Sequence, residues 1–162
     1  MIYRTVFDVG MSGHQTWSVV LPGLAGMAIG AVMFVSRKSV PGWWGRHPRA
    51  TTVFTGFFLA FVCLLTVLEV VSSYSDHSRL TEALRSGRAS VAVGSVSNFK
   101  PMPAAGHAME RFCVSAACFE YSDFIITGAF NNTSSHGGPI REGLPVRVTY
   151  VGNSIVKLEV GQ

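Results

Sequence analysis

The sequence predicts a membrane α-helical hairpin followed by a small all-β domain, an OB-like or SH3-like antiparallel barrel of five to six strands. Three observations predict this fold class. Two apolar stretches almost lack charge, and a basic loop without acidic residues joins them. From residue 89 onward, apolar and polar residues alternate at the period of a β-strand.

The two apolar stretches cover residues 16–36 and 51–73. Each has about 20 residues, which is enough to cross a hydrocarbon core of about 30 Å. Only 14% of the 162 residues are charged, whereas about 25% is usual for a soluble domain. We therefore expect two transmembrane helices, with the lipid bilayer as a partner.

Small residues occur at helical spacing in both apolar stretches. Gly26 and Gly30 form a GxxxG motif in the first stretch, and Gly56 and Ala60 have the same spacing in the second. Small side chains let helix backbones approach closely. We expect these residues to pack the two helices against each other within one chain, or alternatively to join copies of the chain in a homo-oligomer.

The loop over residues 37–50 carries four positive residues and two tryptophans. By the positive-inside rule this loop is cytoplasmic, so both termini are expected in the periplasm of a multi-pass protein of the bacterial inner membrane. Domain boundaries follow: residues 1–74 form the anchor, 75–88 a short helical stalk that ends at Gly87, and 89–162 the small β-barrel domain.

The segment from Glu110 to Asp123 is predicted to form a β-hairpin turning at Ser115-Ala116. In this register Glu110 lies opposite Tyr121, Phe112 opposite Phe119, Cys113 opposite Cys118 and Val114 opposite Ala117. Phe112, Val114, Phe119 and Tyr121 then share one apolar face. A second hairpin around Gly152-Asn153-Ser154 is expected to pair Tyr150 with Val156, Val148 with Leu158, Val146 with Val160 and Arg147 with Glu159.

The two cysteines of the first hairpin, Cys113 and Cys118, meet on the face opposite the apolar one. Adjacent strands bring such a pair within disulfide reach, so an oxidising periplasm predicts a disulfide. A cytoplasmic domain would instead keep two free thiols. A metal site is disfavoured because two cysteines need two further ligands, and no CxxC or HxxxH partner is present.

A set of polar residues around the first hairpin forms the candidate ligand-binding site: His107, Glu110, Tyr121, Asp123, His136 and Arg141. Glu110 is the most informative because it falls on the apolar face beside Tyr121, and a buried carboxylate needs hydrogen bonds or a charge partner. One interpretation is a small pocket that holds a ligand. The other is a structural network in which Glu110 accepts hydrogen bonds from Tyr121 and from loop amides.

No catalytic constellation, metal site or cofactor motif is expected. No nucleophile has a base at a known spacing, and Gly137-Gly138-Pro139 lacks the strand before and the helix after that a phosphate loop requires. The net charge of +4 comes from scattered residues without a basic run, so no nucleic-acid partner is predicted.

Several short motifs carry a resemblance. They are Val96-Ser-Asn-Phe99, Gly106-His107, Glu110-Arg-Phe112, Phe119-Glu-Tyr-Ser-Asp123, His136-Gly-Gly-Pro-Ile140 and Val146-Arg-Val148. Together they resemble a group of uncharacterised small bacterial membrane proteins with two spans and a C-terminal β domain. The resemblance implies a recurring β domain and no known activity. In layout alone, the chain is also similar to the membrane effectors of bacterial cyclic-oligonucleotide anti-phage defence.

The sequence therefore predicts a non-enzymatic, membrane-anchored β domain of the bacterial envelope that binds a protein partner or a small ligand. The alternative is a cytoplasm-facing effector whose β domain senses a nucleotide-like ligand and drives helix association through Gly26 and Gly30. A third hypothesis, an enzyme with Glu110 as acid or base, is the weakest.

Overall fold

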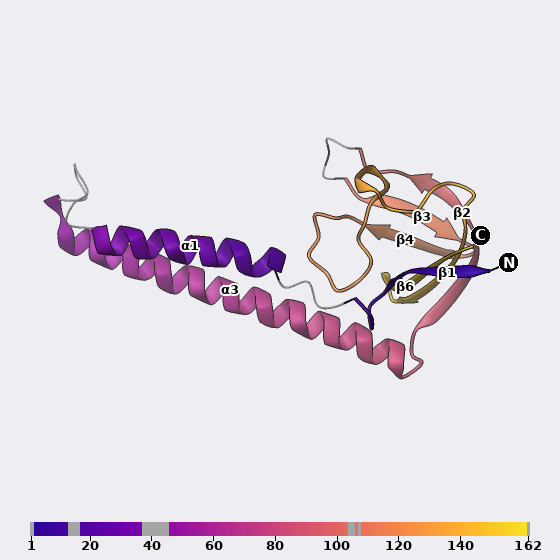
Figure 1. Cartoon of the computed structure of the whole chain (residues 1–162), viewed down its shortest axis with the longest axis horizontal. Coiled ribbons are helices and arrows are strands. Elements are labelled where there is room, and N and C mark those ends of the chain that lie inside the picture. Colours follow the sequence, from indigo (N-terminus) through magenta and orange to yellow (C-terminus); the bar gives the residue numbers. More distant parts are fainter. Residues whose placement is uncertain (1, 13–16, 37–45, 104–105, 107, 162) are drawn as a thin grey trace. The chain divides into compact units, whose positions relative to one another are not determined.

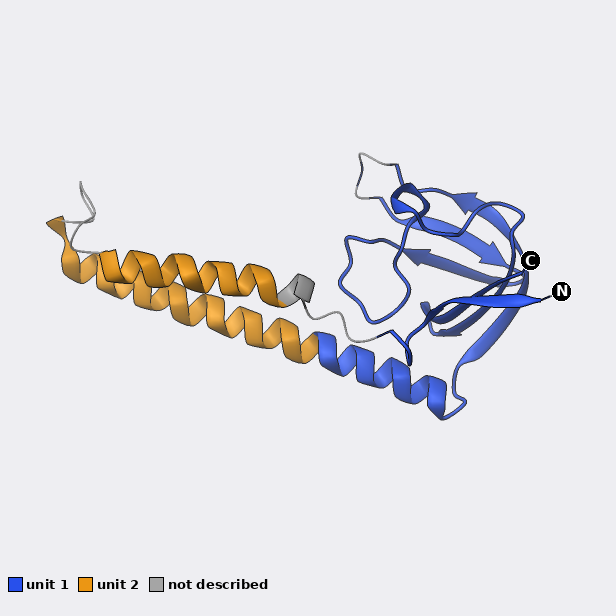
Figure 2. Cartoon of the chain, viewed as in Figure 1, with its two compact units in different colours: residues 1–15, 73–162 blue, residues 16–72 orange. Residues whose placement is uncertain are grey.

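The structure is a computed structural model that describes the chain except residues 1, 13–16, 37–45, 104–105, 107 and 162. Most of the basic loop expected over residues 37–50 thus lies outside the described residues. The chain forms two compact units (Figure 2): a β unit of residues 1–15 and 73–162, which also holds the end of a long helix, and a helical unit of residues 16–72. The N-terminal segment, which we expected in an anchor of residues 1–74, thus belongs with the β unit.

The helical unit contains α1 (Trp17–Val35) and the first part of α3 (Pro48–Arg85), a single helix of 38 residues. Proline is well suited to the first position of a helix because its missing N–H would have no partner there. Within the described part of the chain, α3 is the one helix long and apolar enough to cross a membrane, and the described apolar part of α1, Val20–Val35, is shorter.

Close packing of α1 on α3 within the helical unit depends on the glycines of α1. A Cβ at Gly30 would lie 2.6 Å from Leu59 Cδ2, and one at Gly26 would lie 3.1 Å from Val62 Cγ1. Gly26 and Gly30 therefore face α3 within the same chain, as the first of the two packing alternatives expects. Gly56 and Ala60 do not: both are exposed, and a Cβ at Gly56 would meet no atom within 4 Å.

The face of α3 that meets α1 carries larger side chains instead of small ones, since Leu59 and Val62 lie against Gly30 and Gly26. Thr51 and Thr55 are buried, and each hydroxyl donates to the carbonyl four residues earlier, at 3.2 and 2.7 Å. This bond hides the hydroxyl's polarity within the helix. The glycines of α1 leave space that the larger side chains of α3 fill, so close packing does not require small residues on both helices.

The end of α3 is built into the β unit. Gly87 adopts φ 69°, Arg88 N–H donates to Ala83 C=O at 3.1 Å, and Gly87 N–H donates to Leu84 C=O at 3.3 Å. This is a Schellman end, and it confirms Gly87 as the stop. Leu80 is fully buried in a core cluster with Val9, Ala129 and Val156. Residues 75–88 are thus part of the domain and not a separate stalk.

The β unit is one six-stranded antiparallel sheet in the order β1-β6-β5-β2-β3-β4 (Figure 1). The strands are β1 (Tyr3–Asp8), β2 (Ser90–Lys100), β3 (Glu110–Val114), β4 (Ala117–Tyr121), β5 (Pro145–Val151) and β6 (Ser154–Gly161). A short 3-10 helix, η2, covers Ser134–His136. The sheet is not closed into the barrel that the sequence predicts, because β1 and β4 are its two edges.

Strand β1 is absent from the sequence prediction. It pairs with β6, and Tyr3 lies opposite Gly161. Its side chains alternate only weakly, since all six are exposed or half-buried at the edge of the sheet. Phe7 alone packs against the main core from this strand. A short strand is recognised by its alternation of buried and exposed residues, and here its partner lies at the other end of the chain.

Both predicted hairpins are present. The register of β3 and β4 is confirmed at every pair, including Cys113 with Cys118. The turn residue Ser115 has φ 55°, and its hydroxyl donates to Val93 C=O at 2.9 Å, which supports a conformation that serine rarely adopts. Phe112, Val114, Phe119 and Tyr121 are all buried in the main core, as expected.

The second hairpin departs from prediction at one point. Val146–Val160, Arg147–Glu159 and Val148–Leu158 pair as expected, but a bulge after Thr149 places Tyr150 opposite Ile155 instead of Val156. The turn is a two-residue one at Gly152-Asn153, with Gly152 at φ 61°. The bulge turns Val156 into the second core cluster, beside Leu80, and so joins α3 to the sheet.

Strand β2 connects the two halves of the sheet. Its first part, Ser90–Ser95, pairs with β5, and its second part pairs with β3 from Val96 onward. A glycine within a strand often marks a bulge, but the pairing at Gly94 is regular. The irregularity lies between Ser97 and Lys100, where Asn98 has φ 54°. After β4, residues 124–127 form a loop.

Candidate functional site

Glu110 is the centre of a buried polar network in the β unit. Its side chain is fully buried, and both carboxylate oxygens accept hydrogen bonds. Tyr121 Oη donates to Oε1 at 2.5 Å, Ser134 Oγ donates to Oε2 at 2.5 Å, and Met102 N–H donates to Oε2 at 3.3 Å. The backbone N–H of Ser134 is shared between the two oxygens, at 3.1 and 3.0 Å. The carboxylate is thus satisfied by neutral donors, the arrangement that the structural interpretation expects.

The loop that delivers Ser134 is shaped by two glycines. After η2, Gly137 adopts φ 90°, which an L side chain would resist. Gly138 N–H donates to Thr133 C=O at 2.8 Å, and a Cβ at Gly138 would lie 2.2 Å from Asn132 C=O. Only glycine lets the backbone pass this closely. The Gly-Gly pair therefore serves to fold residues 133–138 over Glu110, and phosphate binding is not needed to explain it.

Asp123 and His136 form the outer part of the network. Asp123 Oδ2 lies 2.5 Å from His136 Nδ1 and accepts from Thr133 Oγ1 at 2.8 Å. Thr133 itself is fully buried. Thr133 and His136 flank Ser134 in the sequence. The contacts of Asp123 with these two residues therefore hold η2 in place from the solvent side, while Glu110 holds it from the core.

Burial raises the pKa of the Tyr121 hydroxyl above its usual range, and the hydrogen bond to Glu110 and the negative charge of that carboxylate raise it further. Each of these disfavours a second negative charge at the same place. Tyr121 is consequently a neutral donor throughout the physiological range and holds the Glu110 carboxylate in a fixed position.

The structure brings together four of the six predicted site residues: Glu110, Tyr121, Asp123 and His136. Arg141 is exposed and contributes its carbonyl to Leu144 N–H at 3.3 Å. His107 lies outside the described residues. The partners that the sequence did not indicate are Met102, Thr133 and Ser134, two of which donate to Glu110 through backbone amides, and a backbone amide leaves no signal in residue type.

Cys113 and Cys118 form the disulfide that the sequence predicts for an oxidising compartment. Their Cα atoms are 4.0 Å apart, on directly opposed positions of β3 and β4. Cys63 is a free, exposed cysteine of the helical unit. The disulfide fastens the edge hairpin on the face of the sheet that points away from the core.

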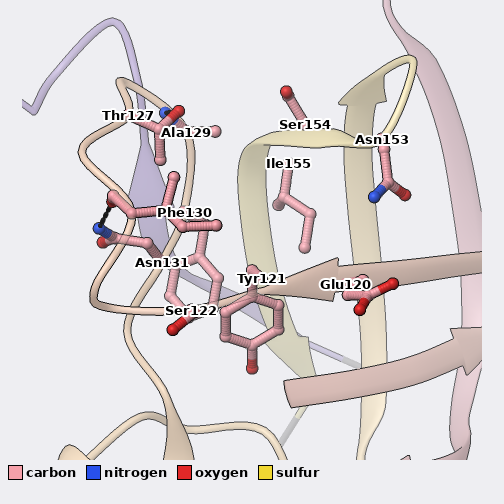
Figure 3. Close-up of a pocket in the computed structure, with 11 residues that line it drawn as sticks. Glu120, Tyr121, Ser122, Thr127, Ala129, Phe130, Asn131, Asn153, Ser154 and Ile155 are labelled. Carbon is pink, nitrogen blue, oxygen red and sulfur yellow. Dashed lines mark hydrogen bonds between the residues drawn. The ribbon is translucent and has the colours of Figure 1, made fainter. Parts of the chain in front are cut away.

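Two surface pockets flank edge strand β4. The first, of about 130 Å³, is lined by Tyr121, Ser122 and Phe130 and, across from them, by Asn153, Ser154 and Ile155 (Figure 3). The second, of about 280 Å³, is lined on β3 and β4 by Arg111, Phe112, Cys113, Cys118, Phe119 and Glu120 and elsewhere by Asn98, Lys100 and Asn153. Glu120 and Asn153 border both pockets. The pockets therefore mark the open side of the sheet, between β4 and the start of β6.

The backbone of β4 offers hydrogen-bonding groups to this open side. In a two-residue hairpin the pair next to the turn exchanges both of its backbone hydrogen bonds, and the bonded pairs then alternate. Ala117, Phe119 and Tyr121 thus bond to β3, while the N–H and C=O groups of Cys118 and Glu120 point outward. Among the described residues, β3 is the one strand that pairs with β4.

The described residues contain no cluster of three histidine, cysteine or acidic side chains that could hold a metal ion. Comparison with family models, curated proteins and solved structures finds no match to this chain. The resemblance to small bacterial membrane proteins therefore stays a prediction, and the site itself must carry any functional argument.

Proposed function

We propose that this chain is a non-enzymatic, membrane-anchored β domain of the bacterial envelope that binds an extended segment of a protein partner beside strand β4. The open edge of β4, with a pocket on each side, carries the proposal. An extended peptide added to a sheet edge gains main-chain hydrogen bonds, and pockets for its alternate side chains give specificity. Outward N–H and C=O groups at Cys118 and Glu120 suit this mode of binding.

A bound strand at this position would lie in the gap between β4 and the start of β6. It would extend the antiparallel sheet toward closure, in the manner of a partly open barrel of the OB-like or SH3-like kind. Hydrogen-bonding groups on an open edge also invite unwanted pairing. β4 is only five residues long, and the disulfide and the ion pair of Arg111 with Glu120, at 2.7 Å, hold it against β3.

Membrane anchoring with two spans is supported by the pairing of β1 with β6. Residues before α1 and after α3 belong to one sheet, so they share one side of any membrane. If α3 crosses the bilayer, the chain must cross it a second time between β1 and α3. Among the described residues of that stretch, α1 is the apolar helix. Its 19 residues extend about 28 Å at 1.5 Å per residue, close to the hydrocarbon thickness.

The periplasmic location of the β domain is supported by the disulfide, because such bonds persist in oxidising compartments and are rare in the bacterial cytosol. The alternative, a cytoplasmic sensor that associates through Gly26 and Gly30, is disfavoured by the same bond. It is also disfavoured because those two glycines already pack against α3. We propose no catalytic role for Glu110, whose oxygens are buried and fully occupied by donors.

The test compares two substitutions at one outward-pointing position. Glu120→Pro removes the N–H that a docking strand would use, and proline is tolerated on an edge strand when its nitrogen faces solvent. Glu120→Gln keeps that N–H. Both variants lose the ion pair with Arg111, so the loss of that pair cannot account for a difference between them.

Linear peptides would be selected from a phage-displayed library on the full chain in lipid nanodiscs, and their Kd measured for each variant. We expect equal binding to the wild type and Glu120→Gln, and at least about ten-fold weaker binding to Glu120→Pro, since one hydrogen bond is worth about 1 kcal/mol and its loss leaves the peptide carbonyl unpaired. Equal binding to all three, or failure to enrich any linear peptide, would contradict strand addition.

A further inference from the structure

Three consecutive apolar residues, Phe124, Ile125 and Ile126, form an exposed loop in the β unit, here called the apolar loop. Their exposed fractions are 52, 45 and 56%. Single exposed apolar residues are ordinary, but an exposed contiguous patch marks an interaction surface. Two hydrogen bonds hold the loop backbone: Ile125 N–H donates to Ser122 C=O at 3.1 Å, and Asn131 Nδ2 donates to Ile125 C=O at 3.0 Å. Apolar side chains are thus presented to the outside.

The chain just after the apolar loop is fastened to α3. Thr127 Oγ1 donates to Asp76 Oδ2 at 3.3 Å. Next to it, a Cβ at Gly128 would lie 3.0 Å from His77 Cα, so glycine lets the loop backbone lie directly on the helix. Ala129 then enters the core cluster that contains Leu80 and Val9. Figure 2 shows the loop within the blue unit above the first blue turns of α3.

The point of attachment is close to the end of the apolar part of α3. That part ends at Val71, and Asp76 follows five residues later in the same continuous helix. At 1.5 Å per residue the separation along the axis is about 7–8 Å. The headgroup layer on each side of a bilayer is about 5–8 Å thick. If Val71 marks the hydrocarbon boundary, then Asp76, His77 and the loop tied to them lie at headgroup depth.

The N-terminal segment reaches the same side of the domain. Val9, eight residues before α1, is fully buried in the cluster with Leu80 and Ala129. Val9 and Leu80 thus lie together with Ala129, three residues after the apolar loop. Asp123, the residue before the loop, is paired with His136 and Thr133. Asp76, which accepts from Thr127, is also paired with Arg79.

We propose that the apolar loop inserts into the headgroup–acyl boundary of the bilayer that α3 crosses, and that it acts as a third membrane contact which fixes the orientation of the β domain on the membrane. The proposal rests on the membrane anchoring proposed above. Ile125 also lines the smaller pocket beside β4, so a partner segment bound there would lie close to the membrane surface.

The test uses spin labels on the full chain with Cys63→Ser, reconstituted into vesicles of phosphatidylcholine and phosphatidylglycerol, with the native disulfide kept oxidised. Labels would be attached to Ile125→Cys and, separately, to Ile126→Cys. Leu65→Cys on α3 is the bilayer reference, and Val91→Cys on β2, an exposed apolar residue at 56% exposure, is the matched control. Collision rates with oxygen, which concentrates in lipid, and with a water-soluble nickel chelate report the depth of each label.

Labels at Ile125 and Ile126 should collide more with oxygen than with nickel, as at Leu65, whereas Val91 should show the reverse. Aqueous behaviour at both loop positions, with Leu65 still in the bilayer, would overturn the loop proposal and leave the anchoring intact. Aqueous behaviour at Leu65 would instead show that the proposed anchoring has failed, and the loop proposal with it. Protection of the loop labels from both collision partners would indicate a protein contact and would also refute lipid insertion.

Discussion

Replacing Glu110 by glutamine tests whether the buried carboxylate is a structural centre. The substitution keeps the size of the side chain but converts one acceptor oxygen into an NH₂ donor. If the remaining oxygen stays with Tyr121 and Ser134 N–H, the new NH₂ group faces Met102 N–H, a second donor. The hydroxyl of Ser134 can rotate to accept, but Met102 N–H then has no acceptor in a buried place.

The magnitude follows from these contacts. A buried donor left without a partner costs about 1–3 kcal/mol, and the two retained bonds become neutral ones, each weaker by about 1 kcal/mol. Relief from burying a charge offsets part of this loss. We expect the free energy of unfolding to fall by about 2–4 kcal/mol. For a domain of this size, that lowers Tm by at least about 10 °C.

The matched control is Glu120→Gln, on the neighbouring strand of the same hairpin. Glu120 makes its ion pair with Arg111 at the surface, and such pairs contribute about 0–1 kcal/mol. Thermal unfolding of the full chain in nanodiscs, followed by near-ultraviolet circular dichroism, would measure both variants. Equal Tm values for the two variants would refute the structural interpretation and restore Glu110 as a ligand-binding residue, since a carboxylate kept for a ligand contributes little to folding.

Three further predictions follow from other parts of the structure. Gly30→Leu should disrupt the packing of α1 on α3, because its side chain would overlap Leu59, while Gly56→Leu should be tolerated. Disulfide trapping between cysteines placed on the two helices would detect this difference. Equal trapping in the two variants would contradict the prediction. Above about pH 10 the unfolded chain ionises Tyr121 while the folded chain, in which the pKa is raised, does not. The free energy of unfolding should therefore fall with rising pH by up to about 1.4 kcal/mol per pH unit. Denaturant titrations at several pH values would measure this dependence, and Tyr121→Phe should remove the contribution of Tyr121 to it. An unchanged pH dependence in Tyr121→Phe would count against the buried hydrogen bond. Finally, in intact bacteria expressing the Cys63→Ser chain, a membrane-impermeant thiol reagent should label Cys113 and Cys118 only after reduction, whereas labelling that needs lysis and no reductant would place the domain in the cytoplasm.

The sequence by itself determines the local elements. Alternation in residues 110–114, 117–121, 146–149 and 157–160 favours one register, because a slip by one residue turns each side chain to the other face. It does not predict the bulge after Thr149, with which Ile155 and Val156 are both buried. The pairing of Cys113 with Cys118 follows from that register, as does the pairing of Arg147 with Glu159. The placement of Glu110 beside Tyr121 on the buried side was predictable for the same reason.

Tertiary structure alone decides how these elements assemble. β1 pairs with a strand at the far end of the chain, and Leu80 of α3 completes a core that no local pattern encodes. Small residues in two helices do not reveal which helix face meets which, so Gly26 and Gly30 pack while Gly56 remains exposed. The donors to Glu110 include backbone amides of Met102 and Ser134, which every residue but proline possesses. Side-chain alternation is a local property that sequence displays, whereas backbone groups and long-range contacts acquire their partners only when the chain has folded.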